Sequence, residues 1–382
     1  MNKSKEMCFV TAYPKDKYYD EEFRRFQGIP TIAITKNGRI FVGWEAGGIT
    51  EPDVNQYCIL HYSDDGGKTW SDPVYVIDAN HKEKIWIGDI QLWIDSNNDL
   101  HIFWVQHEYK NYIENAYNKD SVMSPDIWTM KSGATWDAVC KDPDAEKLSF
   151  EKPKYVFDGQ MRNRPLVTKT GRIIYPAYDE YNIGFRYVYS DDGGKTFETG
   201  FSTSKVKTDG DEQMFYQKDD GTIVYNQRTL TGFIGVAYSK DNGDTWSEAE
   251  NSSIVQCPSR FCIDKLENGH LCLIGNDCFT DNFIDDRINM TIQLSEDEGE
   301  TWTKKLLDSR WQVSYPEFAQ YKDKIYCVWD RERFRAKEIL FCAITEEEIK
   351  DKDFVPELSV ISKSDMVNFV QKVYFPNAPE QE

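Results

Sequence analysis

Short apolar segments separated by polar turns run along the whole chain of 382 residues. The commonest unit is an apolar strand, a turn rich in Asn, Asp, Gly or Lys, and a second apolar strand, as in IPTIAITKNGRIFVGWEAG from Ile29. Apolar runs bounded by such turns predict β-hairpins. Five further copies begin near Gly88, Asn163, Glu212, Ser259 and Ser314.

A second pattern is an octapeptide with a central turn. It occurs as SDDGGKTW from Ser63, SDDGGKTF from Ser190, SKDNGDTW from Ser239 and SEDEGETW from Ser295. Each copy follows an apolar alternating run and precedes another short strand, so it predicts a hairpin turn. Its acidic side chain can bind turn amides and its glycine can adopt a positive φ, which are structural roles. Weaker versions are SGATW at 132–136 and EILFCAIT followed by EEEIKDKDF.

Six repeats spaced by about 50 to 75 residues are typical of four-stranded propeller blades with variable loops. We therefore predict an all-β, six-bladed β-propeller that takes up residues 1–382 as one domain. We expect the segment Met7–Tyr13 or the C-terminal VNFVQKVYF to close the ring. Two separate β-sandwiches, the rival architecture, would not explain one repeat throughout the chain.

Composition narrows the classes of partner. With 65 acidic and 45 basic residues the formal net charge is −20, which disfavours nucleic-acid binding. No apolar run reaches the roughly 20 residues of a membrane helix, and the N-terminus lacks the apolar core of a secretory signal, so we expect a cytoplasmic protein. The nine cysteines form no CxxC pair, which favours reduced core thiols. Five histidines without an HExxH motif favour neither a metal nor another cofactor.

The octapeptides, together with the residues that begin the repeats, resemble the sialidase (neuraminidase) superfamily, whose signature octapeptide is called the Asp box. The resemblance implies an exo-acting glycoside hydrolase that removes a terminal acidic sugar, such as sialic acid, from a glycan. It also implies that the innermost strand of each blade delivers side chains to the central mouth. Asp boxes occur in non-enzymatic propellers as well, so the box alone does not assign an activity.

The resemblance implies three catalytic residues. The tyrosine nucleophile begins the last blade and corresponds to Tyr315 in VSYPEFAQ. Its activating glutamate opens the fourth blade and corresponds to Glu212 in DGDEQMFYQ. An acid/base residue stands about a dozen residues before the first Asp box, where Glu51 lies, with Asp53 and Glu45 as competitors.

The resemblance also implies a set of arginines that hold the substrate carboxylate. Arg228 and Arg287 match two of them. The third would stand just before Ile-Pro in the first blade, where this chain has Gly28. Its acidic partner corresponds to Asp330, in VWDRER, close to Arg331.

Other residues can replace the missing arginine. We expect Asp330 to orient Arg331 instead, or Arg164 to enter from the third blade, where Arg162 is a neighbouring candidate. Asp89, at the matching place in the second blade, is a candidate polar contact for the substrate, as is Asp53.

The chemistry of tyrosine suits such a substrate. A sugar with a carboxylate on its anomeric carbon repels an anionic Asp or Glu nucleophile, whereas a phenol is neutral until a neighbouring carboxylate takes its proton. Two other functions stay open at this point: a catalytically silent propeller that binds glycans or a protein, and a lyase that acts on uronic acids.

Overall fold

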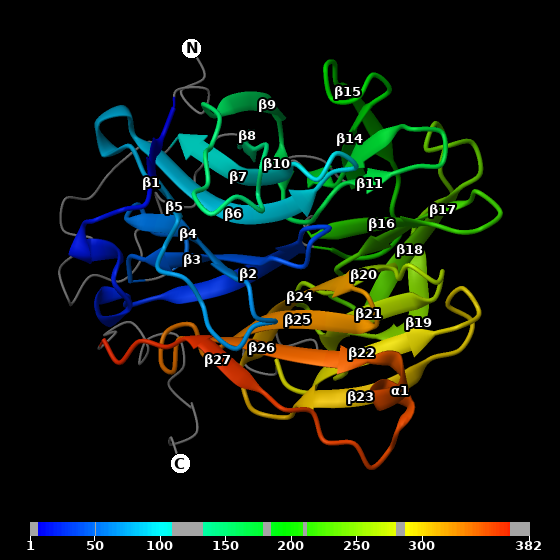
Figure 1. Cartoon of the computed structure of the whole chain (residues 1–382). Coiled ribbons are helices and arrows are strands. Elements are labelled where there is room, and N and C mark those ends of the chain that lie inside the picture. The colour runs from blue at the N-terminus through cyan, green and yellow to red at the C-terminus, as the bar shows by residue number, and fades with distance from the viewer. Residues whose placement is uncertain are drawn as a thin grey trace.

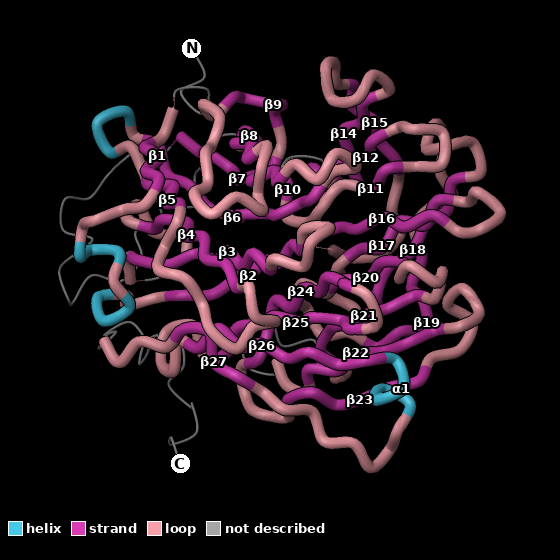
Figure 2. Tube along the Cα trace, in the orientation of Figure 1, coloured by secondary structure: helices cyan, strands magenta, loops and turns pink. Residues whose placement is uncertain are grey.

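The computed structural model describes residues 7–49, 51–108, 133–178, 185–208, 212–279 and 287–366. Six antiparallel sheets stand around a central axis as the blades of a β-propeller, which confirms the predicted fold (Figure 1). Strands account for nearly all the regular structure, as the tube in Figure 2 shows. Within the described ranges, none of the helices has the length and hydropathy needed to cross a lipid bilayer.

The first strand of each blade lies nearest the axis and the last lies at the rim. Blade one contains β2 (Gln27–Ile34), β3 (Ile40–Gly47), β4 (Gln56–Ser63), β5 (Tyr75–Asp78) and, outermost, β1 (Phe9–Ala12). Blade two contains β6 (Ile85–Ile94), β7 (Leu100–Glu108), β8 (Ala134–Cys140) and β9 (Lys154–Asp158). Blade three contains β11 (Leu166–Val167), β12 (Ile173–Tyr175), β14 (Phe185–Ser190) and β15 (Glu198–Ser202), with the small pair β10 (Gln160–Met161) and β13 (Ala177–Tyr178) beside it.

The other three blades are built in the same order. Blade four contains β16 (Gln213–Gln217), β17 (Ile223–Gln227), β18 (Phe233–Ser239) and β19 (Glu250–Val255). Blade five contains β20 (Cys262–Lys265), β21 (Leu271–Asn276), β22 (Met290–Ser295) and β23 (Thr303–Asp308). Blade six contains β24 (Val313–Tyr321), β25 (Lys324–Arg331), β26 (Glu338–Thr345) and β27 (Ser359–Ser362). The helical turns are η2 (Lys17–Tyr19), η3 (Glu21–Phe23), η4 (His81–Glu83) and α1 (Glu346–Lys350).

Apolar packing between adjacent blades holds the ring together. Val42 and Trp44 of blade one pack in one buried cluster with Val328 and Phe341 of blade six. This packing joins the last blade to the first, because removing apolar surface from water is the dominant favourable term in folding. Strand β1 pairs with β5 and so extends blade one, while the other segment expected to close the ring lies outside the described residues. All nine cysteines are free thiols, and every one except Cys278 is buried.

The four Asp boxes lie on the hairpins between the third and fourth strands of their blades, at the rim. In the box of blade four the Ser239 hydroxyl donates to Asp241 at 2.8 Å and accepts the Gly243 amide at 2.8 Å. The Asp241 carboxylate also accepts the Thr245 amide at 2.9 Å. The same three contacts recur in the other boxes, so each box satisfies its own polar groups.

A local distortion recurs where inner strands begin. Ile29, Asp89, Glu212 and Tyr315 all have positive φ, between 51° and 59°. Positive φ is unfavourable for residues with a Cβ and is retained chiefly where surrounding structure imposes it, often at functional sites. In blades one, two and six the strand register also shifts at this point, and such β-bulges re-aim side chains. We call the end of the axis bounded by these four residues the mouth.

Candidate functional site

Tyr315 on β24 lies at the mouth and is 5% exposed. One nitrogen of Arg228, Nη1, donates to the Tyr315 hydroxyl at 3.0 Å and to Glu212 Oε2 at 2.6 Å. Arg228 thus bridges Tyr315 and Glu212, and the Tyr315 side chain helps to lower the pKa of Glu212. The tyrosine, glutamate and first expected arginine therefore form one buried set of contacts, although they come from blades four and six.

The proton positions in this set follow from the charges around it. Burial alone would raise the pKa of Glu212, but Arg228 and Arg162 outweigh it and lower that pKa to about 2. Burial, and then the charge of Glu212, raise the pKa of Tyr315 well above its usual value, although three arginines oppose the shift. At neutral pH the site therefore holds an ionised carboxylate beside a protonated phenol.

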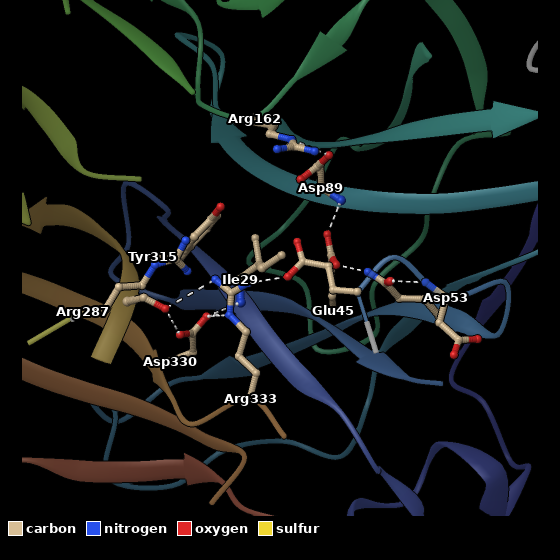
Figure 3. A network of polar contacts seen from close by, with 12 residues as sticks. Ile29, Glu45, Asp53, Asp89, Arg162, Arg287, Tyr315, Asp330 and Arg333 are labelled. Atoms are coloured by element: carbon tan, nitrogen blue, oxygen red, sulfur yellow. Dashed lines mark hydrogen bonds and ion pairs between the residues drawn. The ribbon is translucent and has the colours of Figure 1, made fainter. Parts of the chain in front are cut away.

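Further guanidinium groups surround the Tyr315 ring. The Cζ atom of Arg333 is 4.0 Å from the ring centroid, and that of Arg287 is 5.1 Å away (Figure 3). The Cζ atom of Arg260 is 5.5 Å from the same centroid, and Arg260 donates to the Pro30 carbonyl at 2.6 Å. With Arg228 at the hydroxyl, four arginines therefore lie around Tyr315.

Arg333 is held by side chains from blades one and six. Its Nε donates to Asp330 Oδ2 at 2.9 Å, its Nη2 donates to Ser314 Oγ at 3.4 Å, and its Nη1 pairs with Glu51. Asp330 is fully buried and also accepts the Ile29 amide at 2.7 Å and the Ser314 hydroxyl at 2.6 Å. Asp330 thus fixes Arg333 while tying β2 to β24 and β25.

The arginine that Asp330 binds is Arg333 rather than Arg331, which corrects the expectation from sequence. Arg331 instead pairs with Glu338 at 3.1 Å and Glu332 at 3.3 Å. Arg164 also pairs with other residues than Asp330. Its Nη2 pairs with Asp264 at 3.0 Å, and its Nη1 donates to the Phe318 carbonyl at 2.6 Å.

The opposite side of the mouth carries buried carboxylates (Figure 3). The Asp89 amide donates to Glu45 Oε1, and Gln56 donates to Glu45 Oε2. The Asp89 carboxylate accepts Arg162 Nε at 2.8 Å, and Nη1 of the same arginine is 3.7 Å from Glu212. Arg162 therefore links the acidic side of the mouth to the glutamate beside Tyr315.

Glu45 and Asp89 hold protons more tightly than ordinary carboxylates. Burial, and then the charges of Asp89 and Glu51, raise the pKa of Glu45 well above its usual value. Burial also raises the pKa of Asp89, although Arg162 opposes the shift. Carboxyl groups in such surroundings keep their protons to a higher pH than exposed carboxyl groups do.

The two acidic residues expected in the loop after β3 differ in their surroundings. The Glu51 side chain is 24% exposed and faces Arg333. Asp53 is buried, and its oxygens accept the Ile49 amide at 3.0 Å and the Asn55 amide at 2.9 Å. Asp53 thus braces the loop that presents Glu51.

A metal site is not evident at the mouth among the described residues. Among the described residues, one trio has suitably close ligand atoms, namely His270, Glu296 in the Asp box of blade five, and Glu346 at the start of α1. His270 Nδ1 already contacts Glu346 at 2.7 Å, and Glu296 pairs with Lys350 at 2.5 Å. We assign this trio no cofactor.

Sequence reasoning did not identify Arg333 as a site residue. The signal in the sequence was the arginine-rich segment RERFR at 331–335, which directly follows Asp330 and begins at the last residue of β25. Choosing among its arginines requires the shape of the loop, in which Glu332 and Lys337 have positive φ.

Comparisons with known proteins place the chain in a family. A family model described as a BNR repeat-like domain matches residues 38–327. A curated sialidase from Bacteroides fragilis is 23% identical over 308 residues, which cover 72% of this chain and 54% of that protein. A sialidase from Vibrio cholerae is 29% identical over 165 residues, which cover 35% of this chain and 21% of that protein. The chain thus spans about half the length of the first relative and less of the second.

Solved structures give the same fold. The Hadza microbial sialidase Hz136 superposes with a TM-score of 0.66 and 17% identity, covering 86% of this chain and 67% of that one. The intramolecular trans-sialidase from Ruminococcus gnavus, in complex with oseltamivir carboxylate, has a TM-score of 0.65 and 13% identity, covering 90% and 98%. At such identities the likeness establishes the propeller fold alone.

Proposed function

We propose that this chain, which belongs to the BNR repeat-like domain family and is sialidase-like, is an exo-acting glycoside hydrolase. Its substrate would be a glycan that ends in a sugar acid with the carboxylate on the anomeric carbon. The observation that carries the proposal is the buried contact among Tyr315, Glu212 and Arg228. A phenol, a carboxylate and a guanidinium held together inside a mouth match the needs of a tyrosine nucleophile.

In the first step, the Tyr315 oxygen bonds to the anomeric carbon while its proton passes to Glu212. Because Glu212 is a weak base with a pKa of about 2, this transfer has to accompany bond formation rather than precede it. Arg228 stabilises the negative charge that develops on the phenol oxygen, since it already donates to that atom.

The bond to the leaving sugar breaks in the same step, and its oxygen needs a proton. Glu51 is the proposed donor because it is partly exposed at the mouth, on the loop that Asp53 braces. Water then attacks the anomeric carbon, Glu51 takes a proton from that water, and the bond to Tyr315 breaks while Glu212 returns its proton to the phenol oxygen. The double displacement retains the anomeric configuration.

The test is turnover of three aryl glycosides, namely a sialoside, a Kdo glycoside and a uronide, by the wild type and by Tyr315→Phe. We expect the sialoside to be cleaved and the variant to lose at least about a hundredfold in turnover, as essential groups do. Tyr175→Phe is the matched control, because it removes the hydroxyl of a buried tyrosine beside Gly194 in the Asp box of blade three.

Two outcomes would contradict the proposal. Glycan binding without turnover of any glycoside would favour a silent propeller. An unsaturated uronate product would favour a lyase.

A 3-fluoro sialosyl fluoride adds a direct readout, because the fluorine slows the second step and a labelled Tyr315 peptide would then accumulate.

A further inference from the structure

We propose that Arg333 binds the carboxylate of the substrate, together with Arg287, and so supplies from blade six the cation that blade one lacks. The proposal rests on the proposed function and narrows its substrate class to sialic acids. It concerns a residue at the mouth that the resemblance to sialidases does not indicate.

The first argument is space. A Cβ atom built on Gly28 would lie 2.8 Å from Cγ and Cδ of Arg333, closer than real Cβ contacts. The side chain of Arg333 therefore fills the space that any side chain at Gly28 would need. The Arg333 carbonyl also accepts the Gln27 amide at 3.3 Å, so the loop after β25 runs directly beside β2. An arginine at position 28 and the arginine at position 333 would therefore occupy the same space.

The second argument is orientation. Asp330 holds Nε of Arg333 at 2.9 Å, which fixes the plane of the guanidinium above the Tyr315 ring at 4.0 Å. A planar guanidinium in a fixed position suits bidentate recognition of a carboxylate. The position next to the proposed nucleophile is where a carboxylate on the anomeric carbon would lie.

The third argument is unused binding capacity. Nε of Arg287 is buried and has no hydrogen-bond partner among the described residues, while its Nη2 donates to the Pro258 carbonyl at 3.3 Å. Leaving a buried charged donor unsatisfied is costly, so this nitrogen indicates a missing acceptor. Arg287 and Arg333 both approach the Tyr315 ring, and one carboxylate between them would supply that acceptor.

The fourth argument is that Arg333 already binds a carboxylate that can leave. Nη1 of Arg333 pairs with Glu51, whose side chain is 24% exposed and comes from a loop. A substrate carboxylate can take the place of Glu51 without leaving Arg333 unpaired. The exchange would also free Glu51 for the leaving oxygen.

The experiment measures binding of the 2,3-unsaturated glycal of N-acetylneuraminic acid by calorimetry, and of the same glycal with a carboxamide in place of its carboxylate. Arg333→Ala should weaken binding of the acid by about 10- to 100-fold, the value of one charge-assisted hydrogen bond. Binding of the carboxamide should change much less. A general loss of structure would weaken binding of both ligands equally.

Two further variants separate position from charge. Gly28→Arg in the Arg333→Ala background should restore at least part of the affinity, since Asp330 and the emptied space remain. Gly28→Arg alone should weaken binding because the two side chains collide. Arg172→Ala is the matched control, because Arg172 pairs with Asp191 at 2.7 Å and Asp244 at 2.6 Å at the rim. It should leave the affinity unchanged.

The outcomes distinguish this inference from the proposed function. If the wild type binds the acid and its Tyr315 is labelled by the fluoride, but Arg333→Ala binds the acid equally well, Arg333 is not a carboxylate ligand and only this inference fails. An equal loss for acid and carboxamide would also overturn it. If the wild type neither binds the acid nor is labelled, the proposed function fails, and this inference fails with it.

Discussion

Two glutamates on opposite sides of the mouth are equally buried but lie in opposite electrostatic surroundings. On the side of blades four to six, Glu212 lies between Arg228 and Arg162 and has a lowered pKa. On the side of blades one and two, Glu45 lies beside Asp89 and has a raised pKa. Both glutamates are 1% exposed. The difference therefore comes from the neighbouring charges rather than from burial.

This contrast matches the two requirements of the proposed reaction. A sugar acid needs cations for its carboxylate and an ionised base for the nucleophile, which the first side provides through Arg287, Arg333 and Glu212. The leaving oxygen needs a proton donor, and carboxyl groups that repel one another keep protons. Glu51 stands between the two sides, paired with Arg333 and close enough to raise the pKa of Glu45.

The largest effect is expected on the cationic side. Glu212→Gln keeps the size of the side chain but removes the base, so turnover should fall at least about a hundredfold, as for other essential groups. Steady-state kinetics with an aryl sialoside measure the change. Turnover within a few-fold of the wild type would show that the contact with Tyr315 is structural.

The same variant tests the pH dependence of stability. The pKa of Glu212 is depressed from 4.5 to about 2, so its ionised form stabilises the fold above pH 4.5. This contribution is lost as the pH falls through 2. Denaturation from pH 5 to 2 should therefore show the wild type losing stability faster than Glu212→Gln. Parallel curves would contradict the lowered pKa.

A smaller effect is expected at Glu51, and it should depend on the leaving group. Glu51→Gln cannot donate a proton, so turnover of an alkyl sialoside should fall about a hundredfold, the lower end of the range for general acid catalysis. The leaving oxygen of an aryl sialoside with an acidic phenol needs less help from a proton donor. The rate of the first step should therefore fall less for this substrate. Equal losses for both substrates would remove Glu51 as the acid and favour Glu45 or Asp53.

The propeller could be predicted from sequence because its signals are local. Each Asp box satisfies its own polar groups within eight residues, so the box beginning at Ser239 forms the same turn as the others regardless of the rest of the chain. The starts of the inner strands were visible as well, and the resemblance to sialidases implies the pair of Tyr315 and Glu212 at two of them. Arg228 and Tyr315 lie 87 positions apart in the chain, and the closed ring that the repeats predict brings them into contact.

The replacement at Gly28 could not be predicted in this way. Arg333 reaches Gly28 across the junction of the first and last blades, and the loop that carries it depends on positive φ at Glu332. Nothing local distinguishes it from Arg331, two residues earlier, which faces Glu338 instead. A contact between distant segments decides the choice, and one sequence does not contain that information.

The smallest expected effect sharpens the contrast from the acidic side. The pKa of Glu45 is raised well above 4.5, so the folded protein retains a proton that the unfolded chain releases. This contribution to stability is greatest at low pH and is lost as the pH rises through the raised pKa. Glu45→Gln removes the titrating group, so the wild type should lose stability relative to the variant as the pH rises above 4.5. Denaturation curves from pH 4 to 8 measure the difference. The slope should be opposite in sign to that of Glu212, and two slopes of the same sign would show that the mouth is not divided as we infer.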